Sequence, residues 1–224
     1  MESCVNHPIE TKLSDKGSNL YIFFGGIAAG IAMPPFEFYK AAEILDEHKI
    51  FIRDFKQNWY QTGLPSITKD AHSTALLISK KIEDIKPNKV YFVGNSMGGY
   101  AAILFAHLIG KGEVIAFAPQ TFISPKLRLK HNDYRWLKQI FNTYLKCLFK
   151  PKVFDLKALT NARESNVKVS IFVSKSDALD FIHAEHLNGT KGVVIHTFDS
   201  GGHGVVKLLR DDGKLPEIML GKYT

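Results

Sequence analysis

Residues 89–99 read Lys-Val-Tyr-Phe-Val-Gly-Asn-Ser-Met-Gly-Gly, and this stretch decides the fold. The apolar run 90–93 is typical of a strand that is buried on both faces of a parallel sheet. Residues 94–98 then match the pattern G-x-S-x-G, and apolar residues recur at helical spacing behind them. Such a tight turn strains the serine backbone, and the glycines remove Cβ atoms that would collide with the neighbouring chain. The pattern therefore predicts that Ser96 is a nucleophile, with an ordinary glycine-rich turn as the alternative.

This strand, turn and helix resemble the nucleophile elbow of the α/β-hydrolase superfamily. The resemblance implies an α/β fold with a mainly parallel central sheet, helices on both faces, and the chain order serine, acid, histidine. The order has a chemical reason. A serine hydroxyl is a poor nucleophile until a base takes its proton, and the base needs a carboxylate that fixes its tautomer.

Two later segments fit this order. Asp177 follows a predicted strand at 167–173, where the superfamily carries its acid, and His203 lies on a glycine-rich turn after a predicted strand at 192–198. Asp180 and Asp199 are alternatives for the acid. We favour Asp177 because the first turn after a strand lets a carboxylate reach the neighbouring loop. Asp180 is better explained as a helix N-cap.

Acyl transfer passes through a tetrahedral intermediate whose negative oxygen needs fixed donors. The elbow supplies the N–H of Met97, and the superfamily takes a second donor from the loop after an early strand. Here the loop 25–30 follows an apolar strand pattern at 20–24 and resembles the superfamily's His-Gly loop, with Phe24 in place of the histidine. By position we expect the second donor to be Gly26, with Ile27 as the next choice and a candidate substrate contact. The glycines do not fit G-x-G-x-x-G, which disfavours nucleotide binding.

Another candidate for substrate contact follows the predicted strand at 48–53. Arg53 could grip a carboxylate or phosphate, and Trp59 could stack on substrate. The alternatives are a structural pair between Arg53 and Asp54 and a core position for Trp59. Residues 33–36 are candidates for the wall of an acyl pocket, although Pro35 is more safely read as the first residue of a helix.

The chain alternates predicted strands and helices, which favours a doubly wound, mainly parallel sheet in a single domain over 1–224. The predicted strands are 20–24, 48–53, 89–93, 113–118, 167–173 and 192–198, and the predicted helices are 35–46, 70–86, 97–110, 132–149, 181–188 and 203–211. The long interval 119–165 carries its own helical stripe and predicts a small lid over the nucleophile. A peripheral helix without a role in binding is the alternative.

The formal net charge is +7, and the predicted lid is strongly basic, with Asp133 as the lone acid between its cations. These cations are Lys126, Arg128, Lys130, Arg135, Lys138, Lys146, Lys150 and Lys152. A basic cover favours an anionic or carrier-bound acyl substrate, whereas a solvated helix face is the simpler interpretation. We expect no nucleic-acid partner, because the cations are not part of a recognised module.

The sequence therefore predicts a serine hydrolase for an ester or thioester, without a cofactor. An acyltransferase with the same residues and a non-catalytic binding protein are the alternatives. We expect no metal, because His183 and His186 lack a third ligand nearby. Cys4 and Cys147 do not indicate a disulfide framework. Without a secretory signal or an apolar run of spanning length, we expect a cytoplasmic protein with no membrane span.

Overall fold

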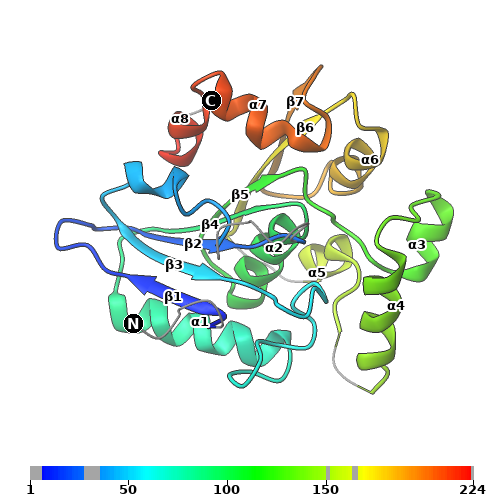
Figure 1. Ribbon diagram of the computed structural model, residues 1–224, viewed down its shortest axis with the longest axis horizontal. Helices are drawn as coiled ribbons and strands as arrows, with labels where there is room; N and C mark the ends of the chain where they lie inside the picture. Colours follow the sequence, from blue (N-terminus) through cyan, green and yellow to red (C-terminus); the bar gives the residue numbers. More distant parts are fainter. Residues whose placement is uncertain (1–6, 28–35, 150–151, 163–165, 223–224) are drawn as a thin grey trace.

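The computed structural model describes residues 7–27, 36–149, 152–162 and 166–222. Its centre is a seven-stranded sheet with the order β1-β3-β2-β4-β5-β6-β7 (Figure 1). All neighbouring strands are parallel except β1 and β3. The strands are β1 (Ile9–Lys12), β2 (Leu20–Phe24), β3 (His48–Ile52), β4 (Val90–Asn95), β5 (Glu113–Phe117), β6 (Lys168–Ser174) and β7 (Val193–Phe198). The six predicted strands are thus confirmed, while the antiparallel edge strand β1 was not predicted.

Both faces of the sheet are covered, which explains the unbroken apolar runs in its strands. Along β2, Leu20, Ile22 and Phe24 face one hydrophobic cluster, and Tyr21 and Phe23 face the other. The first cluster is closed by α1 (Ala71–Ile85), α2 (Met97–Ile109), α5 (Leu156–Asn161) and α6 (Ala178–His186). The second is closed by η2 (Ala41–Ile44), α7 (Val205–Asp211) and α8 (Leu215–Met219). The predicted α/β fold with helices on both faces is therefore confirmed.

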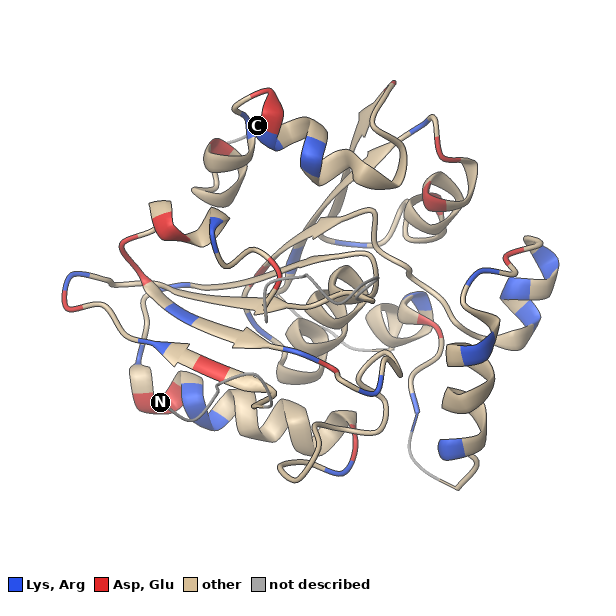
Figure 2. Ribbon diagram, in the orientation of Figure 1, with Lys and Arg blue, Asp and Glu red and all other residues tan. Residues whose placement is uncertain are grey.

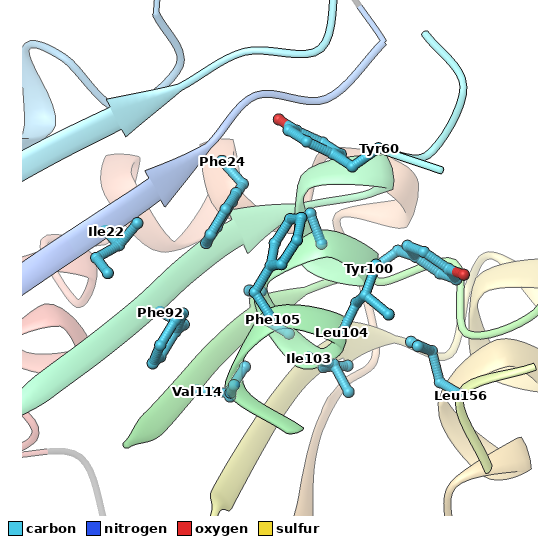
Figure 3. Packing of buried hydrophobic residues seen from close by; sticks show 14 of the residues in the cluster. Ile22, Phe24, Tyr60, Phe92, Tyr100, Ile103, Leu104, Phe105, Val114 and Leu156 are labelled. Carbon is cyan, nitrogen blue, oxygen red and sulfur yellow. The ribbon is translucent and has the colours of Figure 1, made fainter. Parts of the chain in front are cut away.

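Aromatic rings join the central strands to α2 (Figure 3). Phe24 stacks on Phe105 of α2 with ring centroids 5.3 Å apart, and its centroid lies 6.3 Å from that of Phe92 on β4. Helix α2 comes close to the sheet because its first turn contains Gly98 and Gly99, which have no Cβ. A Cβ on Gly98 would lie 2.2 Å from the Phe24 carbonyl oxygen. This close contact fixes the start of α2 against the carboxyl end of β2.

Two predicted helices differ from the observed elements. Between 36 and 46, the described part of the predicted helix 35–46 holds only the short η2, and residues 33–35 lie outside the described chain. The helix predicted at 132–149 begins only at Leu137, as α4 (Leu137–Lys146), and α3 (Pro125–Lys130) precedes it. Asn132 and Trp136 have positive φ angles of 52° and 57°, so the chain bends twice before α4 begins.

Helices α3 and α4 lie at the edge of the molecule, beyond the carboxyl ends toward which the β2 and β3 arrows point (Figure 1). Open α/β sheets place their functional sites at this end of the strands. Across the described ranges, no helix has the length and apolar character needed to cross a bilayer.

Candidate active site

Ser96 lies at the turn between β4 and α2 with φ 54° and ψ −117°, a backbone conformation that is strained for a residue with a Cβ. Gly94 makes the turn possible, since a Cβ there would lie 2.1 Å from the Gly98 carbonyl oxygen. The Ser96 hydroxyl does not cap its own helix, and the side chain is almost buried. The predicted strained elbow is therefore present. It leaves the hydroxyl available at the positive end of the α2 dipole.

His203 lies in the short 3-10 turn η3 (Gly202–Gly204), directly after the end of β7. Its Nδ1 is 2.6 Å from Oδ2 of Asp180, a carboxylate that is fully buried at the first turn of α6. This hydrogen bond, opposed in part by burial, raises the pKa of His203 above its usual value. Because Nδ1 faces the carboxylate, Nε2 is the ring nitrogen left for proton exchange with a substrate or a nucleophile.

The contacts favour Asp180 over Asp177 as the partner of His203, whereas we expected Asp177 to orient the imidazole and Asp180 to cap the helix. Asp177 is the N-cap of α6, and its carboxylate accepts a 3.0 Å hydrogen bond from the Asp180 N–H. Since α6 begins immediately after Asp177, that side chain turns back to its own helix. Asp199 is also excluded, because it is 96% exposed and forms an ion pair with Lys175.

A buried network continues from Asp180 into the insertion at 119–165. Arg135, which precedes α4, donates from Nη1 to Oδ1 of Asp180 at 2.7 Å and from Nε to Asp133 at 3.0 Å. Asp133 is buried and also accepts from Arg128 and from Nε2 of His183. Burial alone would raise the pKa of Asp180, but the hydrogen bonds and charges of His203 and Arg135 lower it overall. Asp180 is therefore an ionised carboxylate that is bound by His203 through one oxygen and by Arg135 through the other.

The loop after β2 departs from the expected oxyanion hole in one respect. The N–H of Gly26 donates a 2.7 Å hydrogen bond to Oε2 of Glu37, while Oε1 accepts from the Asn95 side-chain amide at 3.2 Å. Burial raises the pKa of Glu37, although these hydrogen bonds and the charge of His203 oppose the rise. The predicted donor is thus present but occupied by a carboxylate. Glu37 was not predicted as a site residue, because it lies in the predicted helix 35–46 and outside any motif.

Ser96 and His203 line the same cavity, which has a volume of about 750 Å³. Its lining also includes Gly26, Ile27 and Arg53, three of the residues predicted to contact substrate or oxyanion. Apolar side chains from η2, the segment before it, α7 and α8 form much of the remaining wall: Phe36, Phe38, Ile44, Val206, Leu215 and Met219. Lys40 and Arg210 add two further cations to the lining.

The expected contact between Trp59 and substrate is not supported. Trp59 is fully buried, and its indole N–H donates a 2.8 Å hydrogen bond to Gln120, so the core alternative applies. The Asp54 carboxylate accepts backbone N–H groups of its own loop, including those of Asn58 and Tyr60.

The insertion contributes only Trp136 to the described cavity lining. Its lysines, which we considered as a positive cover, are absent from the described lining, and Arg135 is used in the network with Asp180. Lys150 lies outside the described residues. The cations in the described cavity lining are therefore Arg53 after β3, Lys40 before η2 and Arg210 of α7, and none of them belongs to the insertion.

One group of side chains has the spacing of a metal site. Ligand atoms of Asp177, Asp180 and His203 lie within 4.8 Å of one another. Arg135 already supplies a cation to Asp180, so a metal ion would compete with the guanidinium. His183 and His186 have separate partners, Asp133 and Asp155. We assign no metal role to these groups.

The strained serine elbow, the histidine after the last strand and the sheet order together define the α/β-hydrolase fold. The chain belongs to an uncharacterised protein family, UPF0227, whose model matches residues 44–207. No curated protein matches the chain in sequence.

Solved structures confirm the fold. The capsule O-acetyltransferase of Neisseria meningitidis serogroup A superposes with a TM-score of 0.63 at 18% identity, covering 92% of this chain and 88% of that one. MenH from S. aureus superposes with a TM-score of 0.62 at 14% identity, covering 96% of this chain and 97% of that one. A lipase-esterase related protein from Clostridium acetobutylicum superposes with a TM-score of 0.59 at 14% identity, covering 95% of this chain and 99% of that one.

Proposed function

We propose that this chain is a serine hydrolase that cleaves an ester or thioester, with Ser96 as the nucleophile, His203 as the base and Asp180 as the orienting acid. One observation carries the proposal. A serine on a strained elbow lines the same cavity as a histidine whose Nδ1 binds a buried carboxylate. Serine, base and orienting acid are the three parts that acyl transfer through an acyl-enzyme requires.

The first half-reaction forms the acyl-enzyme. Nε2 of His203 takes the Ser96 proton as Oγ bonds to the acyl carbon, and the same proton then passes to the leaving alcohol or thiol as its bond to carbon breaks. In the second half-reaction, water gives a proton to His203 and its oxygen bonds to the acyl carbon. The bond between the acyl carbon and Ser96 Oγ breaks, the carboxylic acid product is released, and the proton on His203 returns to Ser96. Asp180 stays ionised and stabilises the imidazolium in both halves.

The oxyanion needs donors on the elbow side of the cavity. The N–H of Met97 lies at the start of α2, where the helix dipole also favours negative charge. Gly26 provides the second N–H only after the Glu37 carboxylate leaves, because one N–H cannot serve two anions at once.

The cavity favours an acyl group with apolar character, because much of its wall is aliphatic or aromatic. Arg53, Lys40 and Arg210 along the lining support a small-molecule or carrier-bound substrate whose other end is anionic. This part of the proposal predicts that replacing Arg53 by glutamine slows an acyl thioester with a phosphorylated carrier group more than a neutral p-nitrophenyl ester.

An acyltransferase is the second candidate, and one finding favours it. The structural neighbours include a capsule O-acetyltransferase, in addition to a lipase-esterase related protein. The same three residues would serve both reactions, with an alcohol in place of water in the second step. A non-catalytic binding protein on this fold is less well supported, because it has no use for a strained serine in the same cavity as a histidine that binds a buried carboxylate.

A fluorophosphonate probe tests the proposal, since it phosphonylates only activated serines. We expect labelling of the wild type, loss of labelling in Ser96→Ala, and strong reduction in His203→Ala. Ser79→Ala, on α1 and outside the cavity lining, is the matched control and keeps full labelling. An unlabelled wild type, or equal labelling of Ser96→Ala, overturns the assignment.

Product analysis separates the two reactions. Release of free acid from an ester in the presence of a dilute acceptor alcohol supports hydrolysis. If the new ester predominates under the same conditions, acyl transfer replaces hydrolysis as the assigned reaction.

A further inference from the structure

Helix α4 has a second apolar face that the fold does not use. Its inner face is formed by Ile140, which is buried, and by Trp136 and Tyr144, which pack against the main cluster. On another face, Leu137, Phe141, Leu145 and Leu148 are 52–62% exposed. Their spacing of four, four and three residues places these side chains in one line along the helix and its last turn. We call these four residues, together with Tyr134 and Phe149, the α4 stripe.

The α4 stripe is large for a solvent-facing surface. Phe149 is 99% exposed and extends the stripe beyond the end of the helix. Single exposed apolar residues are normal, but four in a line along one helix, with Tyr134 before it and Phe149 after it also exposed, mark an interaction surface.

The charge around the α4 stripe has one sign. Residues 121–149 contain a single acid, Asp133, which is buried and bound to Arg128, Arg135 and His183. Lys138 and Lys146 lie on the exposed side of α4 next to the stripe, and Lys126 and Lys130 are exposed on α3. Figure 2 shows this group of basic residues on α3 and α4. An apolar line beside lysines is the pattern of a helix that binds in the headgroup region of an anionic bilayer.

We propose that the α4 stripe docks this protein on an anionic phospholipid surface. The apolar side chains enter the boundary between headgroups and acyl chains, and the lysines contact the phosphates. Two copies of the chain fit less well, because face-to-face pairing would bring Lys138 and Lys146 of both copies together. An acidic protein fits the charge but would need a matching apolar groove. The projecting position of α4 at the edge of the molecule, with Phe149 beyond its end, suits a soft planar surface (Figure 1).

The α4 stripe lies close to the candidate active site. Trp136, which directly precedes Leu137 of the stripe, lines the cavity that contains Ser96. A surface that contacts the α4 stripe therefore lies beside that cavity. The proposal concerns binding alone, so its test does not depend on whether Ser96 is catalytic.

The test is co-sedimentation with vesicles made of equal parts phosphatidylglycerol and phosphatidylcholine, compared with vesicles of phosphatidylcholine alone, at low ionic strength. We expect the wild type to bind the anionic vesicles and to be released by high salt. The double variant Phe141→Ser, Leu145→Ser lowers the partition coefficient at least about tenfold, since two large apolar anchors are removed. The double variant Lys138→Gln, Lys146→Gln lowers binding to the anionic vesicles by about fivefold per lysine.

Leu76→Ser is the matched control, because Leu76 is 72% exposed on α1, far from α4 in sequence. It leaves binding unchanged, and thermal melts verify that all variants fold. The proposal is overturned if the wild type does not sediment with anionic vesicles, or if Leu76→Ser weakens binding as much as the stripe variant. It is also overturned if the stripe variant abolishes a concentration-dependent dimer, or binding to polyglutamate, in a protein that does not bind vesicles.

Discussion

Arg135 donates a 2.7 Å hydrogen bond to one oxygen of the buried Asp180 carboxylate, whose other oxygen lies 2.6 Å from the His203 ring. A residue of the insertion thus reaches the acid that orients the candidate base. The position of the insertion and the state of His203 are therefore linked through one carboxylate.

Arg135→Gln removes a cation that opposes protonation of His203 and a donor that holds Asp180 in place. We expect kcat to fall about tenfold or more, since misplacing a catalytic group by a small distance is costly. The pKa of His203 rises, so the acid limb of the kcat/KM profile moves to higher pH. Arg135→Lys restores part of the rate. Lys138→Gln, an exposed change in the same insertion, is the control and leaves the pH profile of kcat/KM for p-nitrophenyl acetate unshifted. An unshifted profile in Arg135→Gln would contradict the link.

Asp180→Asn and Asp177→Asn separate the two aspartates. We expect Asp180→Asn to lower kcat by about 10³–10⁴-fold, because an amide no longer stabilises the imidazolium or selects its tautomer. Asp177→Asn keeps a side chain that caps α6 well, so the rate and the stability remain near the wild type. Steady-state kinetics of both variants decide the matter. The reverse ranking would restore Asp177 as the acid.

The wild-type pH profile has its own expected shape. His203 acts as a base only when neutral, and its hydrogen bond to Asp180 raises its pKa above 6.5. Activity is therefore lost as the pH falls through that raised pKa, and the midpoint of the acid limb lies above 6.5. Measurement of kcat/KM from pH 5 to 9 checks this. A flat profile across that range excludes His203 as the base.

Glu37→Ala frees the Gly26 N–H from its carboxylate partner. One oxyanion donor contributes about 10²–10³-fold to kcat in acyl transfer, so even partial release speeds acylation of Ser96, and we expect an increase of up to about tenfold. The rate of fluorophosphonate labelling measures this directly. Glu43→Ala, an exposed change in η2, is the control. Slower labelling in Glu37→Ala would show that the carboxylate supports the site instead of occupying it.

Gly98→Ala tests the packing beneath the elbow. The added Cβ would lie 2.2 Å from the Phe24 carbonyl oxygen, so either α2 or β2 must shift. We expect a loss of about 1–3 kcal/mol in the free energy of unfolding, measured with urea. Gly204→Ala is the control, because nothing lies within 4 Å of a Cβ at that position and its φ is negative. Equal stability of the two variants would show that the contact relaxes without cost.

The parallel strands were predictable because burial on both faces leaves continuous apolar runs such as Leu20–Phe24. The edge strand β1 was missed because Ile9–Lys12 carries only one buried residue and a mixed polar pattern. The helix 132–149 was drawn too long, since its periodicity does not reveal the positive φ angles at Asn132 and Trp136.

The site was predictable in part for a similar reason. Ser96 and His203 sit on glycine-rich turns that leave a clear pattern, and the structure places both on one cavity. The choice between Asp177 and Asp180 depended on where α6 begins, which sequence patterns locate only to within a few residues. Glu37 and Arg135 reach the site from distant segments, and their contacts depend on tertiary packing.

The buried position of Asp133 has a consequence for protein engineering. Arg128, Arg135 and His183 converge on this one carboxylate, so it joins α3, the start of α4 and α6. The insertion at 119–165 is therefore not an exchangeable module. A chimaera that receives another protein's insertion also loses Arg135, so the buried Asp180 carboxylate keeps its contact with His203 but has one fewer cation.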